Sequence, residues 1–168
     1  MNAETGADVF GSSWNARTRV QEYGGASAGK CFKNSKEFDL LFTILLVVHD
    51  GILIFYNFKD GQVYRQALKP GEIPQKVTSN PAHRFADFAI HPLHPHLVVC
   101  ILEDHTHDSP DKVLTSLVTI DTRIDGEENG RVSILISGAD FYSNPRFNED
   151  GTLLAWCQWN HPDMPWDG

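Results

Sequence analysis

The chain has 168 residues, of which 41% are hydrophobic and 21% are charged, and its formal net charge is −8. This composition is typical of a globular domain. The negative charge argues against nucleic acids and anionic membranes as partners, because both bind through basic surfaces. The three cysteines are too widely spaced to indicate a disulfide framework, and the first residues lack the basic and apolar regions of a secretory signal, so we expect a cytoplasmic protein.

An apolar run over residues 40–48 is the first strong pattern along the chain. It covers about nine residues, whereas a membrane-spanning helix needs about 20, so the run does not predict a membrane span. It has no periodicity and is compatible with a buried strand or with a short core helix.

Strand and turn patterns follow this run. Residues 52–58 are rich in β-branched and aromatic side chains, Lys59-Asp60-Gly61 forms a turn, and residues 62–66 alternate polar and apolar side chains. This order predicts a β-hairpin. Further strands are expected at residues 75–78, 84–90, 97–102, 113–121 and 132–136. Because no segment shows a convincing helical period, the predicted fold class is all-β.

A weak internal repeat relates two of the later segments. Residues 88–92, followed by residues 97–99, resemble residues 145–149, followed by residues 153–156. The offset of about 56 residues is close to the period of the four-stranded blades in β-propellers. We therefore predict an incomplete β-propeller of about two to three four-stranded antiparallel blades. Such a stack leaves apolar blade faces uncovered, so we expect self-association through these faces.

Five histidines in two predicted loops are candidate metal ligands. His91, His94 and His96 surround two prolines, and His105 and His107 lie among acidic residues. Imidazole and carboxylate are suitable ligands for zinc or copper. Both groups fall in loops, however, and metal sites need ligands that converge on a rigid frame. We therefore predict no metal site and no cofactor.

Two other motifs are considered for catalysis. Residues 25–29 match the Gly-x-Ser-x-Gly pattern of a nucleophile elbow, which would make Ser27 the nucleophile of a small esterase. An elbow needs a helix directly after the serine, and residues 30–34 have neither a cap nor a helical period, so we interpret the motif as a glycine-rich turn. The acidic pairs at 103–104 and 127–128 do not indicate an acid/base pair, because adjacent residues on a strand point to opposite faces.

Several blocks of sequence together resemble the amino-terminal propeller of the prolyl oligopeptidase family, in particular its dipeptidyl-peptidase and acylaminoacyl-peptidase-like branch. They occur in the family's order, at residues 17–25, 57–65, 84–88, 103–105, 137–142 and 159–168. Members of the family pair this propeller with a carboxy-terminal α/β-hydrolase domain, whose Ser-Asp-His triad hydrolyses peptides. In the family, the propeller restricts access to the active site to short or unstructured peptides.

The resemblance divides the chain into three parts. Residues 1–30 correspond to the remnant of a shortened first blade, and residues 51–168 correspond to the following blades. Residues 31–50 form an apolar insert in a block that is nearly continuous in the family, and we hypothesise that it is a retained intron or a mistaken gene model. Because residues 159–168 have the turn chemistry of an unfinished hairpin, we expect the last blade to be cut.

The resemblance implies a non-catalytic propeller fragment of a prolyl-oligopeptidase-type serine peptidase. The parent would hydrolyse short peptides with dipeptidyl or acylaminoacyl release, and a peptide substrate is expected only in that full-length parent. This chain lacks the hydrolase domain and is assigned no catalytic residue. Glu22 and Tyr23 are the substrate-gating candidates. The alternative function is a free-standing propeller-like protein-interaction module.

Overall fold

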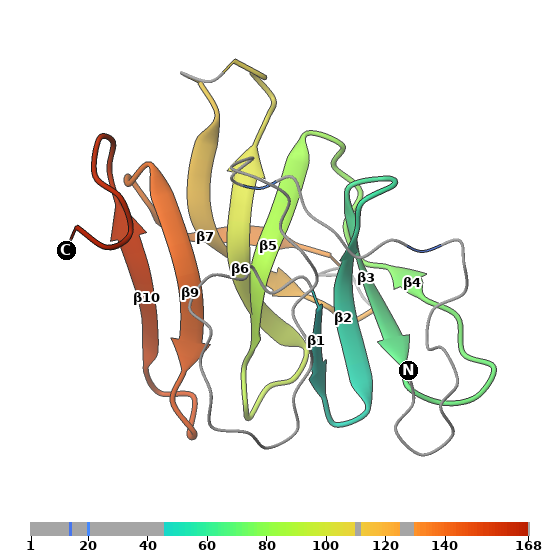
Figure 1. The fold of residues 1–168 in the computed structure, drawn as a ribbon. Helices are drawn as coiled ribbons and strands as arrows, with labels where there is room; N and C mark the ends of the chain where they lie inside the picture. The colour runs from blue at the N-terminus through green and yellow to red at the C-terminus, as the bar shows by residue number, and fades with distance from the viewer. Residues whose placement is uncertain (1–13, 15–19, 21–45, 110–111, 125–129, 168) are drawn as a thin grey trace.

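The computed structural model describes residues 14, 20, 46–109, 112–124 and 130–167. Ten strands in this part of the chain form three antiparallel sheets, and no helix lies among the described residues (Figure 1). Accordingly, the described segments contain no helix that is long and apolar enough to cross a membrane. The all-β prediction is confirmed.

The first sheet has the strand order β1-β2-β3-β4. Its strands are β1 (Leu46–His49), β2 (Ile52–Asn57), β3 (Gln62–Ala67) and β4 (Gln75–Lys76). Asp50 and Gly51 join β1 to β2 with positive φ angles of 47° and 72°, as a two-residue hairpin turn requires. In the next turn, the backbone N–H of Gly61 donates to the carbonyl oxygen of Asn57 at 2.9 Å. The hairpin predicted for residues 52–66 is confirmed.

β1 lies inside the segment that was predicted as an insert, residues 31–50. It pairs with β2 from Leu46 opposite Phe55 to His49 opposite Ile52. The first sheet therefore includes residues 46–49, whereas the prediction starts the blades at residue 51. The end of the apolar run is a strand because β2 supplies its hydrogen-bond partners. Residues 31–45 lie outside the described residues, and the origin of the insert stays a prediction.

The second and third sheets continue the same antiparallel pattern. The second sheet contains β5 (His83–Ile90), β6 (Leu97–Asp104), β7 (Leu114–Asp121) and β8 (Val132–Ser137), in that order. The third sheet contains β9 (Phe141–Phe147) and β10 (Leu154–Trp159). The strands predicted for the second sheet are confirmed, and their ends differ from the prediction by at most a few residues.

The internal repeat appears as a pair of matching bulges. β5 carries an extra residue between Ala86 and Ala89 relative to β6, and β9 carries one between Ser143 and Arg146 relative to β10. Each bulge contains a residue with a positive φ angle, Asp87 at 54° and Asn144 at 53°, and these two residues are 57 apart in sequence. The bulge is thus a repeated feature of the first strand of successive sheets.

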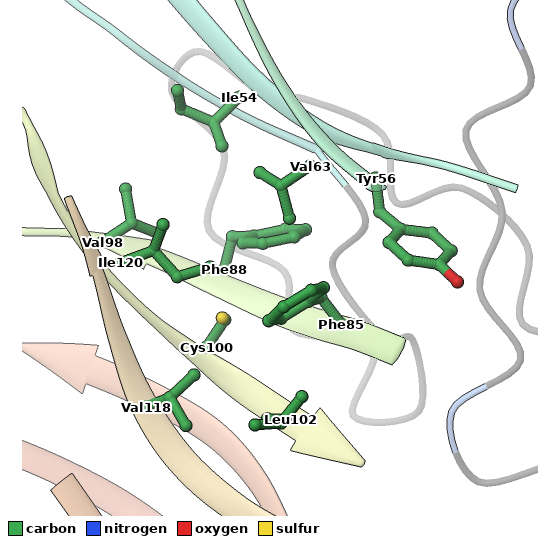
Figure 2. Close-up of a cluster of buried hydrophobic side chains, with 10 residues drawn as sticks. All are labelled: Ile54, Tyr56, Val63, Phe85, Phe88, Val98, Cys100, Leu102, Val118 and Ile120. Atoms are coloured by element: carbon green, nitrogen blue, oxygen red, sulfur yellow. The ribbon is translucent and has the colours of Figure 1, made fainter. Parts of the chain in front are cut away.

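The core lies between the sheets. One cluster of buried side chains joins the first and second sheets and contains Ile54, Tyr56, Val63, Phe85, Phe88, Val98, Cys100, Leu102, Val118 and Ile120 (Figure 2). A second cluster joins the second sheet to the third through Ala86, Val99, Ile101, Leu117 and Tyr142. Alternate residues of β6 face the two clusters, so this strand is buried on both faces. Each fully buried aliphatic or aromatic side chain stabilises the fold by about 1.5–3 kcal/mol.

The first strands of the three sheets lie side by side. β5 packs against β1 on one side and against β9 on the other (Figure 1). Four-stranded sheets packed face to face, with their first strands gathered together, are the arrangement of propeller blades around a central axis. The predicted fold, an incomplete β-propeller of about two to three blades, is confirmed.

Candidate functional site

A groove of about 350 Å³ crosses the first strands of all three sheets. It is lined by Val47, Phe88, Ala89, Ile90, Pro92, Arg146, Phe147, Asn148 and Glu149. Val47 comes from β1, while the other residues come from β5, from β9 and from the loops that follow these two strands. In a propeller these strands face the central channel, so the groove lies where a molecule passing along the channel would meet the protein.

The groove combines an apolar floor with two opposite charges. Phe88, Ala89 and Ile90 form part of the floor, and the exposed side chains of Arg146 and Glu149 belong to its lining. The guanidinium Nη1 of Arg146 donates to its neighbouring backbone carbonyl at 2.6 Å. An apolar surface with one guanidinium and one carboxylate suits a ligand that is apolar in the middle and charged at its ends.

A buried carboxylate links the two strands that carry most of the groove. Asp87 is 3% exposed, and its Oδ2 accepts a hydrogen bond from the backbone N–H of Asn144 at 3.0 Å. The contact joins the bulge of β5 to the bulge of β9, and it therefore fixes the position of one strand relative to the other. Sequence reasoning missed this role, although an aspartate within an otherwise apolar strand was the available signal.

Cys100 lies in the core behind the groove and is not a nucleophile. Burial raises the pKa of its thiol well above the usual value, and the negative charge of Asp87 raises it further. The reactive form of cysteine is the thiolate, so a buried thiol with a raised pKa is inert.

The first group of histidines folds into a compact loop next to the groove. The Nδ1 of His91 accepts hydrogen bonds from the backbone N–H groups of Leu93 and His94, both at 3.2 Å. The ring of His91 lies 4.8 Å from the ring of His94 and 4.9 Å from the ring of Phe147. Through these contacts, the imidazole of His91 stabilises the loop. In the part of the chain that the structure describes, no group of three or more histidine, cysteine or acidic side chains is placed to hold a metal.

His105, in the second group of histidines, is also engaged in local contacts. His105 lies between Glu103, at 3.2 Å from Nε2, and Asp108, at 2.7 Å from Nδ1. The hydrogen bond from His105 lowers the pKa of Asp108. Asp104 bonds to a different group, since its Oδ1 accepts from the backbone N–H of Thr106 at 2.8 Å. The neighbouring carboxylates at 103 and 104 thus have separate partners.

A second cavity, of about 360 Å³, lies between the second and third sheets. Its lining includes Val99, Leu135, Leu154 and Trp156, and the titratable side chain of the lining is that of His91. We interpret this cavity as a gap between two blades, because a ligand there would find few groups to fix its orientation.

The remaining sequence-based candidates lie outside the described residues. These are the substrate-gating pair Glu22 and Tyr23, the serine of the elbow-like motif, Ser27, and the acidic pair at residues 127–128. Their predictions therefore stay predictions. The structure instead brings together the groove residues of β1, β5 and β9. From the sequence, residues 88–92 and 145–149 match as a repeat, but the match does not assign them to a site.

Comparison with known proteins gives one informative match. No protein-family model and no curated protein matches the chain. A solved structure described as the crystal structure of puromycin hydrolase is 27% identical to it, with a TM-score of 0.67, over 94% of this chain and 23% of that one. The chain thus spans about a quarter of the length of that structure. The match confirms the predicted resemblance to the amino-terminal propeller of the prolyl oligopeptidase family.

Proposed function

Since the chain resembles this propeller, we propose that it is the non-catalytic propeller part of a cytoplasmic, prolyl-oligopeptidase-type serine peptidase. The parent enzyme would hydrolyse short peptides, with dipeptidyl or acylaminoacyl release. The observation that carries the proposal is the groove across β1, β5 and β9, which lies on the face where a propeller borders its channel. In this function the groove guides a peptide toward a catalytic serine that another domain supplies.

The charges of the groove suit a short peptide with free ends. Arg146 can attract the terminal carboxylate and Glu149 the terminal ammonium group, while the apolar floor contacts the side chains. Glu22 and Tyr23 are proposed as substrate-gating residues of the complete enzyme, in which Glu22 would face the substrate amine.

The absence of catalysis in the isolated chain is tested with an active-site probe. A fluorophosphonate reacts covalently with an activated serine. We expect no labelling of the 168-residue chain and no hydrolysis of short peptides. Labelling at Ser27 would contradict the proposal and support an esterase instead.

The groove is tested with tetra-alanine that has free termini. In NMR titrations of the chain, we expect Arg146→Gln and Glu149→Gln each to weaken binding roughly fivefold or more, the loss of one charge-assisted contact of about 1 kcal/mol. Lys69→Gln removes an exposed charge away from the groove and serves as the control. Equal affinity of all three variants would count against a peptide groove.

The alternative, a free-standing interaction module, is favoured by apolar side chains on the surface. Ile134 is 68% exposed and Leu153 is 69% exposed, and exposed apolar residues are common in protein-binding surfaces. The genomic sequence downstream distinguishes the two functions. An in-frame α/β-hydrolase domain supports the peptidase, and its absence supports the module.

A further inference from the structure

The bulge of β5 decides which of its side chains reach the groove. In a regular strand, residues two apart share a face, so Phe85 and Phe88 would point to opposite sides of the sheet. Both belong to the cluster between the first and second sheets (Figure 2), whereas Ala86 belongs to the cluster between the second and third sheets. The extra residue of the bulge therefore turns Phe88 toward the first sheet, where it lines the groove.

The bulge of β9 has the same effect in the third sheet. Tyr142 is a member of the cluster between the second and third sheets, and Phe147, five residues later, packs against that cluster. A regular strand would place these two rings on opposite faces. Arg146 lies directly after the bulge, opposite Ala155, and lines the groove together with Phe147. The guanidinium thus reaches the groove from a strand that has gained one residue.

Each bulge holds a residue other than glycine in the left-handed region. Among the described residues, those with this feature are Asp50, Asp87 and Asn144. Asp50 lies in a hairpin turn that requires a positive φ angle, whereas the other two lie within strands. Residues held in this region persist when the surrounding structure fixes them, and they are concentrated at binding and catalytic sites. The hydrogen bond of 3.0 Å from the backbone N–H of Asn144 to Oδ2 of Asp87 joins the two bulges.

We infer that Asp87 is the positioning residue by which the groove selects a peptide with a free carboxyl terminus. By accepting the hydrogen bond from Asn144, its carboxylate places Arg146 of β9 in the same groove as Phe88 of β5. Asp87 is 3% exposed and does not belong to the lining, so it acts through Arg146 and not on the peptide itself. The inference rests on the proposed function of the groove and adds the residue that sets its selectivity.

Selectivity for the carboxyl end of a peptide separates this role from a general effect on stability. The two probes are tetra-alanine and its carboxy-terminal amide, compared by NMR titration at a temperature where each variant is folded. The unchanged chain should bind the free acid about fivefold more tightly than the amide, the value of one charge-assisted contact. Arg146→Gln removes that contact and should bring the affinity ratio to about one.

Asp87→Gly and Asn144→Gly form a matched pair of variants. Glycine adopts φ angles near 54° and 53° without strain, so neither substitution forces the backbone of its bulge. Asp87→Gly removes the acceptor and should lower the affinity ratio to less than about twofold, whereas Asn144→Gly keeps the backbone N–H and should keep the ratio at about fivefold. Asp87→Asn retains a side-chain oxygen and should restore most of the ratio.

Two results of this comparison would overturn the inference and leave the peptide groove in place. One is an affinity ratio that stays at about fivefold in Asp87→Gly. The other is an equal fall of the ratio in Asp87→Gly and Asn144→Gly, because only the first of these variants loses the acceptor.

Hydrogen exchange in the unchanged chain provides a second measurement, which does not require a variant to fold. Because coupling between two sites is reciprocal, a peptide carboxylate that depends on the link must also stabilise the link. At equal saturation, tetra-alanine should therefore slow exchange of the Asn144 backbone N–H more than its carboxy-terminal amide does. Equal slowing by the two peptides would overturn the inference. A chain that binds neither peptide would contradict the proposed function, and this inference with it.

Discussion

β6 and β10 have similar apolar sequences and very different surroundings. β6 pairs with β5 on one edge and with β7 on the other, and its residues pack into core clusters on both faces. β10 pairs with β9 alone among the described strands, and one of its faces carries the exposed Cys157. An apolar strand is therefore not sufficient to mark a core position, because its role depends on which neighbours the rest of the chain supplies.

Core aromatics should show the largest difference between the two regions. Phe85 is fully buried between the first and second sheets (Figure 2), and we expect Phe85→Ala to lower the free energy of unfolding by about 3–5 kcal/mol. Phe141 is partly exposed in the third sheet, and Phe141→Ala should cost about 1–2 kcal/mol. Urea denaturation measures both. Equal losses of unfolding free energy would contradict the difference between the buried core of the first two sheets and the more exposed third sheet.

The link between the bulges should have the next largest effect. Asp87→Ala removes the acceptor of the Asn144 amide and places alanine at a φ angle of 54°, so we expect a loss of about 2–4 kcal/mol. Asp87→Asn keeps a side-chain oxygen and tolerates this backbone conformation, and it should cost less. Hydrogen exchange at the Asn144 amide should accelerate in the alanine variant. Unchanged exchange there would show that β9 is held in place by other contacts.

Two glycines with the same backbone angle can sharpen the comparison of sheet contacts. Gly51 and Gly151 both have φ angles of 72°. A Cβ added at Gly151 would lie 2.4 Å from Cε1 of His91, whereas a Cβ added at Gly51 would have no atom of a non-neighbouring residue within 4 Å. Both alanine variants are strained by about 1–2 kcal/mol. We expect Gly151→Ala to lose about 1–2 kcal/mol more in thermal or urea unfolding, because the His91 ring must move. Similar losses would mean that the two loops do not pack tightly.

The smallest effect is expected at the rim of the first sheet. Burial acts to raise the pKa of Asp60, but hydrogen bonds from Lys76 and Tyr64 outweigh it and hold the pKa below its usual value. The resulting stabilisation is present above the unfolded-state pKa of about 3.9 and disappears as the pH falls through the lower folded-state pKa. Because the pair is largely exposed, Lys76→Met should cost less than about 1 kcal/mol at pH 7.

The pH dependence is the control for this ion pair. In urea unfolding, the difference between the Lys76→Met variant and the unchanged chain should shrink between pH 5 and pH 2, where Asp60 takes up its proton. A difference that is constant with pH would assign the loss to packing of the lysine stem.

Local patterns predicted the strands but not the surfaces that they form. Turn residues and alternation were sufficient for the hairpin of residues 52–66. The similarity of two segments was sufficient for the repeat, which was expected at about 56 residues and is seen as bulges 57 residues apart. The strand at residues 46–49 could not be separated from a helix, because a uniform apolar run has no period.

The groove could not be predicted because its residues come from distant segments. Val47 and Arg146 meet the same space only after three sheets have packed together. The link from Asp87 to Asn144 likewise depends on two bulges, and single-sequence patterns do not reveal which strand gains an extra residue. The gating pair Glu22 and Tyr23 lies outside the described residues and stays a prediction.

The carboxylate of Asp87 reaches the corresponding position of the next repeat, not an unrelated loop. When a blade is duplicated, the carboxylate that links it to the next blade is duplicated with it. Adding a blade to a propeller then requires no new interaction between blades. Between the second and third sheets, this link fixes the position of one first strand relative to the next.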